Sequence, residues 1–343
     1  MKKIGIWGAI TALSALLLTG VSPVQGAPIT LSLADQNSDL SWGPVHATQP
    51  WAKKVEEATK GQVKIQIYPS QTLAKGKESW NAVRDGIADM AWFAGGQHPG
   101  MMPYIDVITL PGLFKTAEKG SEILWKLYER FPSIKKELAD NQVILLHTIT
   151  PFHILTSRKQ VKTLEDLKGL KIRTVAGQPT EQMKLLGGIP IVLPMPECYE
   201  ALDKGTVEGM LAPMEPIPGF KLYEVTKYIA EVPYAANFMT VIMNKKKWSR
   251  LSKENQDAIM SVSGLEGSKW FGKNFADSAT EGVPQIAKKA GRELTVYTLP
   301  EAERQRWIEV SGKPLWEAWV KGCESKGLTE ARKILETALE FSK

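Results

Sequence analysis

The segment 163–173 reads TLEDLKGLKIR and ends on an arginine that is well placed to hold a carboxylate. Thr163 is suited to cap a short helix, and Gly169 can take the left-handed conformation that ends one. The apolar strand that follows places Arg173 at its carboxyl end, where open α/β folds bind ligands. A guanidinium there offers a rigid pair of donors that matches a carboxylate. The alternative is a surface arginine that pairs with a neighbouring acid.

Residues for metal binding or nucleophilic catalysis do not occur at their usual spacings. The four histidines form no His-x-x-x-His pair, and the sequence has no Gly-x-Ser-x-Gly elbow. The acidic pairs Glu56-Glu57 and Glu165-Asp166 fit the solvated faces of helices. We therefore expect no metal, no cofactor and no enzymatic activity, with an exported enzyme as the less favoured alternative.

Residues 1–26 have the three parts of a secretory signal peptide. Lys2 and Lys3 form a positive start, 4–18 is an almost unbroken apolar run, and 24–26 supplies small residues at the positions read by a signal peptidase. We expect cleavage after Gly26 or Ala27 and export to the periplasm. A retained membrane anchor is the alternative.

The composition of the mature chain indicates a two-domain protein. Removal of residues 1–26 leaves 343 − 26 = 317 residues, which is long for a single core. The formal charge falls from +6 to +4, because the removed segment carries two lysines and no acid. The basic runs are no longer than 245–247, so we expect no nucleic-acid partner. Cys198 and Cys323 do not make a disulfide scaffold, and whether they pair is left open.

The order of expected strands and helices predicts an α/β fold with two lobes. Strands at 30–34, 63–68 and 88–93 alternate with helices at 43–59 and 78–84, which favours a parallel sheet covered by helices. A second unit opens near Pro151. We expect lobe I to hold 27–150 plus about 239–278, and lobe II to hold 151–238 plus about 279–343.

The chain resembles the solute-binding proteins of tripartite ATP-independent periplasmic (TRAP) transporters, of the C4-dicarboxylate-binding (DctP) type. The segments that carry the resemblance are 63–71, 85–91, 110–114, 163–173, 194–202, 205–209 and 221–228. The resemblance implies a type II-like periplasmic binding protein fold, with hinge strands and a long C-terminal helix that braces both lobes. It also implies capture of a small organic acid between the lobes and delivery to integral membrane permease subunits. A module that feeds a sensor receptor is the alternative.

The resemblance makes Arg173 the arginine that anchors the ligand, but other family positions differ. Phe152 or His153 replaces a second arginine, Ala212 replaces an asparagine, and Met195 replaces a phenylalanine. A second carboxylate would lack a partner in the closed cleft, which is costly. These changes therefore disfavour a short dicarboxylate or a sialic acid. His153 is either a hydrogen-bond donor to the carboxylate or a structural histidine.

Aromatic residues are expected where the family has polar groups. Trp92 and Phe93 end a strand that should face the cleft, and Trp42 follows the first strand. Such side chains can enclose an apolar ligand, although burial in the core is the alternative for each. Glu215 either reaches an amino or hydroxyl group of the ligand or caps a helix. The sequence predicts a monocarboxylate with an apolar or aromatic body, such as a 2-oxo acid, a 2-hydroxy acid or an aromatic amino acid.

Overall fold

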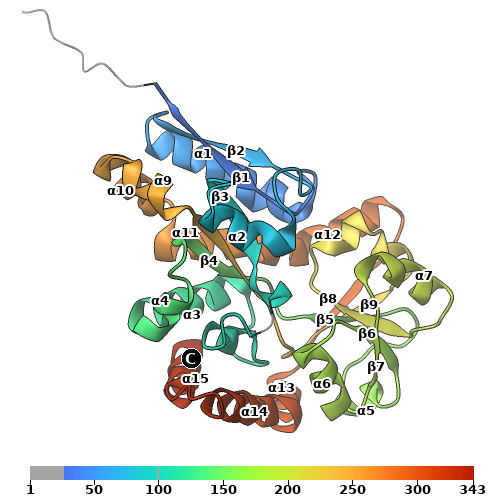
Figure 1. The fold of residues 1–343 in the computed structure, drawn as a ribbon. Coiled ribbons are helices and arrows are strands. Elements are labelled where there is room, and N and C mark those ends of the chain that lie inside the picture. The colour runs from blue at the N-terminus through green and yellow to red at the C-terminus, as the bar shows by residue number, and fades with distance from the viewer. Residues whose placement is uncertain (1–26, 99) are drawn as a thin grey trace, which may run out of the picture.

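The computed structural model describes residues 27–98 and 100–343, and the expected signal peptide, residues 1–26, lies outside them. The described chain forms two α/β lobes, each built on a mixed β-sheet with helices packed against it (Figure 1). The strand order is β2-β1-β3-β10-β4 in lobe I and β11-β9-β5-β8-β6-β7 in lobe II. Within these residues, no helix is both long and apolar enough to cross a membrane.

The sheet of lobe I has central strands that are apolar on both faces. Its strands are β1 (Ile29–Ala34), β2 (Val63–Tyr68), β3 (Met90–Ala94), β4 (Gln142–Thr148) and β10 (Phe238–Met243). β1 is parallel to β2 and β3, whereas β10 runs antiparallel between β3 and β4. Every residue of β3 and β10 is buried, as is usual for strands covered on both faces. The helices of this lobe are α1 (Gln49–Ala58), α2 (Ser79–Arg84), α3 (Ala117–Arg130), α4 (Pro132–Glu137), α9 (Lys245–Arg250) and α10 (Lys253–Ser261).

The sheet of lobe II carries the candidate arginine on one of its inner strands. Its strands are β5 (His153–Thr156), β6 (Lys171–Thr174), β7 (Ile189–Val192), β8 (Gly209–Ala212), β9 (Tyr228–Glu231) and β11 (Thr295–Thr298). β6 is parallel to β7 and β8, and β5 runs antiparallel between β8 and β9. The helices of this lobe are α5 (Leu164–Leu167), α6 (Gln178–Leu185), α7 (Cys198–Asp203) and α8 (Pro216–Gly219).

The described chain crosses between the lobes four times. Two crossings are extended segments, from β4 to β5 and from β9 to β10. The third is a continuous helix made of α11 (Gly264–Gly272), a π-helical turn at Lys273–Asp277 and α12 (Ser278–Lys289). α11 packs against α3 and β4, whereas α12 packs against α8, so this helix braces both lobes as predicted. The fourth is the helix of α13 (Glu301–Trp307), a π-helical turn at Ile308–Gly312 and α14 (Lys313–Glu324).

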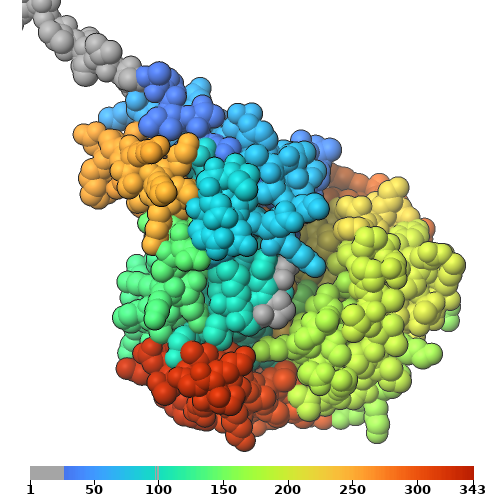
Figure 2. Space-filling model, viewed as in Figure 1, coloured from blue at the N-terminus to red at the C-terminus, as the bar shows by residue number. Residues whose placement is uncertain are grey.

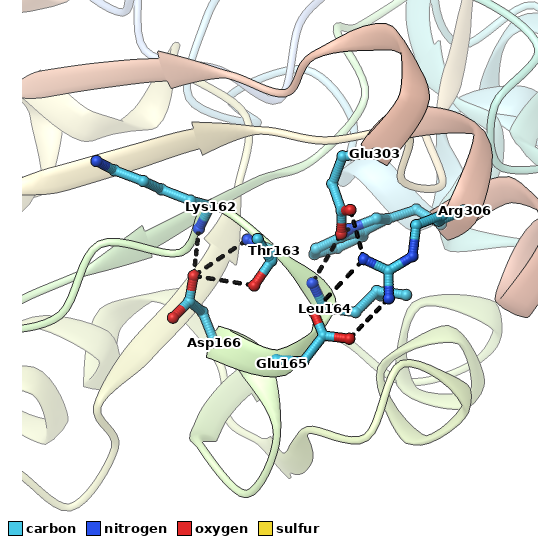
Figure 3. A network of polar contacts seen from close by, with 8 residues as sticks. Lys162, Thr163, Leu164, Glu165, Asp166, Glu303 and Arg306 are labelled. Atoms are coloured by element: carbon cyan, nitrogen blue, oxygen red, sulfur yellow. Dashed lines mark hydrogen bonds and ion pairs between the residues drawn. The ribbon is translucent and has the colours of Figure 1, made fainter.

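A polar network fixes α13 to α5, immediately before the strand that carries Arg173 (Figure 3). Glu303 accepts hydrogen bonds from the Leu164 N–H at 2.9 Å and from the Trp307 indole at 3.1 Å. Arg306 pairs with Glu303 at 2.6 Å and with Glu165 at 2.7 Å. Arg306 is half exposed, so its ion pairs add little, whereas Trp307 is fully buried and provides the main anchor.

The last helices of the chain pack on lobe I rather than on lobe II. The Trp316 indole donates to the Pro111 carbonyl at 2.9 Å, and the Trp319 indole donates to that of Pro103 at 3.1 Å. Val320 of α14 and residues of α15 (Ala331–Ser342) share one apolar cluster with α3. The expected assignment of 279–343 to lobe II is therefore wrong beyond α13. The sheet on which a helix packs is not encoded in its own apolar periodicity.

A buried tryptophan joins the first strands of lobe I to the long helix. Trp51 of α1 is fully buried, and its indole donates to the Ser263 hydroxyl at 3.1 Å. Its ring makes an edge contact with Phe271 of α11, at 6.4 Å between centroids. This contact links α1, which packs against β2, to the helix that continues into lobe II.

We expect Trp51→Ala to lower the free energy of unfolding by about 3–5 kcal/mol, since it removes a large buried side chain and leaves a cavity. Trp51→Phe should cost less, because only part of the volume and the bond to Ser263 are lost. Urea titrations monitored by circular dichroism measure both changes. Leu40→Ala, at a side chain that is 85% exposed, is the control and should change stability by less than about 0.5 kcal/mol. A small effect of Trp51→Ala would contradict the structural role.

Candidate ligand-binding site

Arg173 is a buried cation with no anionic partner among the described residues. The residue is 3% exposed, at the third position of β6. Its Nε donates to the Leu193 carbonyl at 2.8 Å, and its Nη1 donates to the Leu211 carbonyl at 3.0 Å. Burial lowers the pKa of Arg173 from its ordinary value, but a guanidinium stays charged at neutral pH. Two carbonyl oxygens do not neutralise the guanidinium charge, and a bound anion would do so.

Strand register places three predicted site residues on one face and at one edge of the lobe II sheet. Arg173 is opposite Met210 of β8, and Ala212 is opposite His153 of β5. Met210 and Ala212 are two residues apart and therefore share a face. Arg173, Ala212 and His153 consequently lie along the same edge, as the sequence predicts for ligand-binding residues of an α/β sheet.

A cavity of about 650 Å³ lies between the lobes and is called the cleft cavity here. Lobe I contributes residues of β3 and the turn after it, lobe II contributes 175–179, and the β9–β10 crossing contributes 235–239. The furrow between the lobes is visible in Figure 2. Arg173 does not line the cavity but is two residues before Val175, so the lobe II wall continues directly into the strand that carries the arginine.

Trp92 lines the cleft cavity, as predicted, and is held rigidly from behind. Its ring stacks on Phe275 of the long helix, with 5.5 Å between centroids. Its indole donates to Nε2 of His147 at 3.0 Å. Nε2 must then be unprotonated, and the Nδ1–H of His147 donates to the Thr148 carbonyl at 3.2 Å. Burial lowers the pKa of His147 to about 3, which keeps the ring neutral.

The start of α6 forms much of the lobe II wall, a feature that the sequence analysis did not identify. Gly177, with φ of 91°, precedes the helix, and Gln178 and Pro179 begin it. The first N–H groups of a helix have no partner within it, and its positive end favours an anion. The glycine followed by proline at the second helical position is the sequence signal for such a helix start.

Polar residues of the opposite wall were also outside the sequence prediction. Gln36, Asp106 and Asn237 all line the cleft cavity. Gln36 follows β1, and Asn237 immediately precedes β10, so both lie at strand ends where polar side chains are typical of binding sites. Burial raises the pKa of Asp106 to about 7.

The structure places two of the predicted aromatic residues away from the cleft cavity. Phe93 lies on the opposite face of β3 from Trp92 and is fully buried between Trp80 and His98, at centroid distances of 5.1 and 4.6 Å. The expectation that Phe93 contacts the ligand is therefore wrong, because neighbours in a strand point to opposite faces. Trp42 donates from its indole to the Ser278 hydroxyl at 2.9 Å, so it packs on the long helix.

Phe152, Met195 and Ala212 pack against other residues of the protein and do not line the cleft cavity. Phe152 is 5% exposed, and its N–H donates to the Ala235 carbonyl at 3.0 Å, which pairs the two extended crossings. Met195 packs at the margin of the apolar cluster of lobe II, and Ala212 is fully buried within that cluster. Their roles in ligand binding stay predictions.

His153 and Glu215 are buried polar groups without hydrogen-bond partners. Neither ring nitrogen of His153 is bonded, and burial lowers its pKa to about 4. Both carboxyl oxygens of Glu215 are buried and unbonded, and burial raises its pKa to about 8. Glu215 precedes α8 but makes no side-chain cap to it, which contradicts the capping alternative. At pH 7 His153 is thus neutral, and most molecules hold Glu215 protonated.

The sequence matches a profile of the DctP family, described as bacterial extracellular solute-binding protein, family 7, over residues 43–321. The 2,3-diketo-L-gulonate-binding periplasmic protein YiaO of Escherichia coli (strain K12) is 28% identical over 271 residues, which cover 78% of this chain and 80% of YiaO.

Two crystal structures show the same two-lobed fold, which confirms the predicted fold class. One is a TRAP solute-binding protein from Rhodoferax ferrireducens T118 in complex with copurified benzoate, with a TM-score of 0.79, 28% identity, and coverage of 92% of this chain and 97% of that one. The other is a TRAP solute-binding protein from a marine metagenome, specific for aromatic acid ligands, in complex with 3-hydroxybenzoate. Its TM-score is 0.80, with 28% identity and coverage of 92% and 98% of the two chains.

We expect His147 to make stability depend on pH. Its pKa of about 3 in the folded protein is below the ordinary value of about 6.5, so the unfolded chain binds the proton more tightly. This contribution to stability is complete above pH 6.5 and is lost as the pH falls toward 3. His147→Gln should be less stable than the wild type at pH 7, and the deficit should shrink by up to about 1.4 kcal/mol per pH unit between pH 6 and 4.

Urea titrations at a series of pH values measure this deficit. Trp92→Phe is the matched control, because it removes the same hydrogen bond and leaves the titratable ring. Its deficit should vary less with pH. A deficit of His147→Gln that is constant from pH 7 to 4 would contradict the neutral buried histidine.

Proposed function

The chain belongs to the DctP family of bacterial extracellular solute-binding proteins and is a TRAP solute-binding protein, and from this premise we propose that it captures a monocarboxylate with an aromatic or similarly bulky apolar body. The carboxylate binds Arg173 and the body lies against Trp92 in the cleft cavity. The observation that carries the proposal is the buried guanidinium of Arg173, which has only carbonyl partners. A ligand carboxylate would supply the missing charge and add charge-assisted hydrogen bonds.

The lining of the cleft cavity favours one carboxylate over two. Trp92, Met239 and Pro179 offer apolar surface, and the start of α6 favours an anion on the Arg173 side. On the lobe I side, Asp106 supplies no positive charge for a second carboxylate, and Lys77 is exposed to water. We therefore favour a monocarboxylate over the short dicarboxylate that the name of the family type implies. The benzoate and 3-hydroxybenzoate complexes of the two structural relatives support an aromatic acid, and a sugar acid like that of YiaO is the alternative.

The cellular role follows from the family. We infer that the mature protein works in the periplasm after loss of residues 1–26, and that it delivers its ligand to integral membrane permease subunits. A sensor receptor as recipient is the alternative. The role is binding rather than catalysis. Closure would move lobe I, formed by 27–150, 239–278 and 313–343, against lobe II, formed by 151–238 and 279–312.

We expect isothermal titration calorimetry to show binding of benzoate, 3-hydroxybenzoate or phenylpyruvate and weaker binding of succinate. Arg173→Ala should weaken the affinity for the bound acid by about 3 kcal/mol, or roughly 100-fold, because the ligand charge loses its partner. Arg173→Lys should recover part of the loss, since it restores charge without the paired donors.

Lys171→Ala is the matched control, because it removes an exposed cation from the same strand. Its affinity should equal that of the wild type. An unchanged affinity of Arg173→Ala would refute the anchor. Tighter binding of succinate than of every aromatic acid would refute the monocarboxylate class and leave the family membership intact.

A further inference from the structure

A second cavity of about 360 Å³ lies where the four crossings between the lobes meet, and is called the hinge cavity here. Thr150 and His153 come from the first extended crossing and Glu231 from the second. Asp277 comes from the long helix, and Arg304 comes from α13. The hinge cavity shares no lining residue with the cleft cavity. Its volume is within the usual range for small-molecule sites.

Two deeply buried side chains of the hinge cavity lack hydrogen-bond partners. Thr150 is 3% exposed and its hydroxyl is unbonded, and His153 is 5% exposed with both ring nitrogens unbonded. Buried polar groups are nearly always bonded to protein, water or ligand. Because burial keeps His153 neutral, its ring can donate one hydrogen bond and accept another. The hinge cavity therefore offers unbonded polar groups with which an occupant could form hydrogen bonds.

The charges around the hinge cavity favour an occupant with both signs. Arg304 is 9% exposed, and its hydrogen bond to the Phe114 carbonyl is long, at 3.4 Å. Glu231 and Asp277 line the same space. One oxygen of Glu231 accepts the Thr298 hydroxyl at 2.5 Å, and Asp277 accepts the N–H groups of Ala117 and Glu118 at 2.6 and 2.9 Å. Lys115 and Glu281 also line the cavity, so its wall carries both cations and carboxyl groups. An occupant with charges of both signs can pair with each kind, whereas an ion of one sign also meets groups of its own charge.

We propose that the hinge cavity is a second binding site that takes a small zwitterion of the α-amino acid class, with its carboxylate toward Arg304 and its ammonium toward Glu231. Thr150 and His153 supply the remaining hydrogen bonds. Because all four crossings line the site, rotation of the lobes changes its shape. A ligand that fits one arrangement better shifts the equilibrium between open and closed forms, and so changes the affinity of the cleft.

The test is a thermal-shift screen of the twenty standard L-amino acids against the full mature protein and its Arg173→Ala variant. Loss of the cleft anchor separates the two sites. At least one small amino acid should raise the melting temperature of both proteins equally. No shift with any amino acid, or a shift abolished by Arg173→Ala, would overturn the proposal. The outcome of this screen is independent of whether the cleft binds an aromatic acid, so the two proposals can fail separately.

Two variants then locate the site. Thr150→Val and Glu231→Gln should each weaken the amino acid at least tenfold by calorimetry, whereas Glu254→Gln on the exposed face of α10 should not. Equal affinities in all three variants would overturn the assignment. The affinity for the acid bound in the cleft should change at least threefold when the amino acid is saturating, and by reciprocity the acid should change the amino acid affinity by the same factor. An unchanged affinity would overturn the coupling between the sites.

Discussion

The structure depends on a guanidinium that is buried without a counter-charge. Folding places Arg173 on an inner strand, under the helices of lobe II, with carbonyl oxygens as its partners. Carbonyl dipoles offset part of the desolvation cost but do not neutralise the charge. The remaining cost favours the binding of an anion. The capped helix α5, which is bonded to α13, precedes the strand and fixes its start.

The four crossings limit how the two lobes can move relative to each other. The extended crossings pair with each other through the hydrogen bond from the Phe152 N–H to the Ala235 carbonyl, which ties one to the other. The two helical crossings each contain a π-helical turn near the point where they leave one lobe for the other. Such turns weaken the regular bond pattern of a helix and are common at functional sites. Both lobes can therefore stay rigid while these crossings deform.

Local sequence patterns were sufficient to identify the strand that carries Arg173 and its capping helix, because caps and strand ends are set by nearby residues. The same patterns predict both Trp92 and Phe93 at the cleft, whereas only Trp92 lines the cleft cavity, since neighbours in a strand point to opposite faces. The position of α14 and α15 depends on contacts with Pro103 and Pro111, which are far away in the chain. No local pattern encodes such contacts, and the hinge cavity was unpredictable for the same reason.

Neutral neighbours keep the charge of Arg173 available to the ligand. Glu215 follows the strand next to the arginine, and as a carboxylate it would compete with the ligand for the guanidinium. Its burial without hydrogen bonds raises its pKa to about 8, so at pH 7 most molecules hold it protonated. His153 lies at the same edge of the sheet and is neutral because burial lowers its pKa. Burial thus favours the neutral form of both groups. The positive charge at this edge of the sheet comes from Arg173, which stays protonated even when buried.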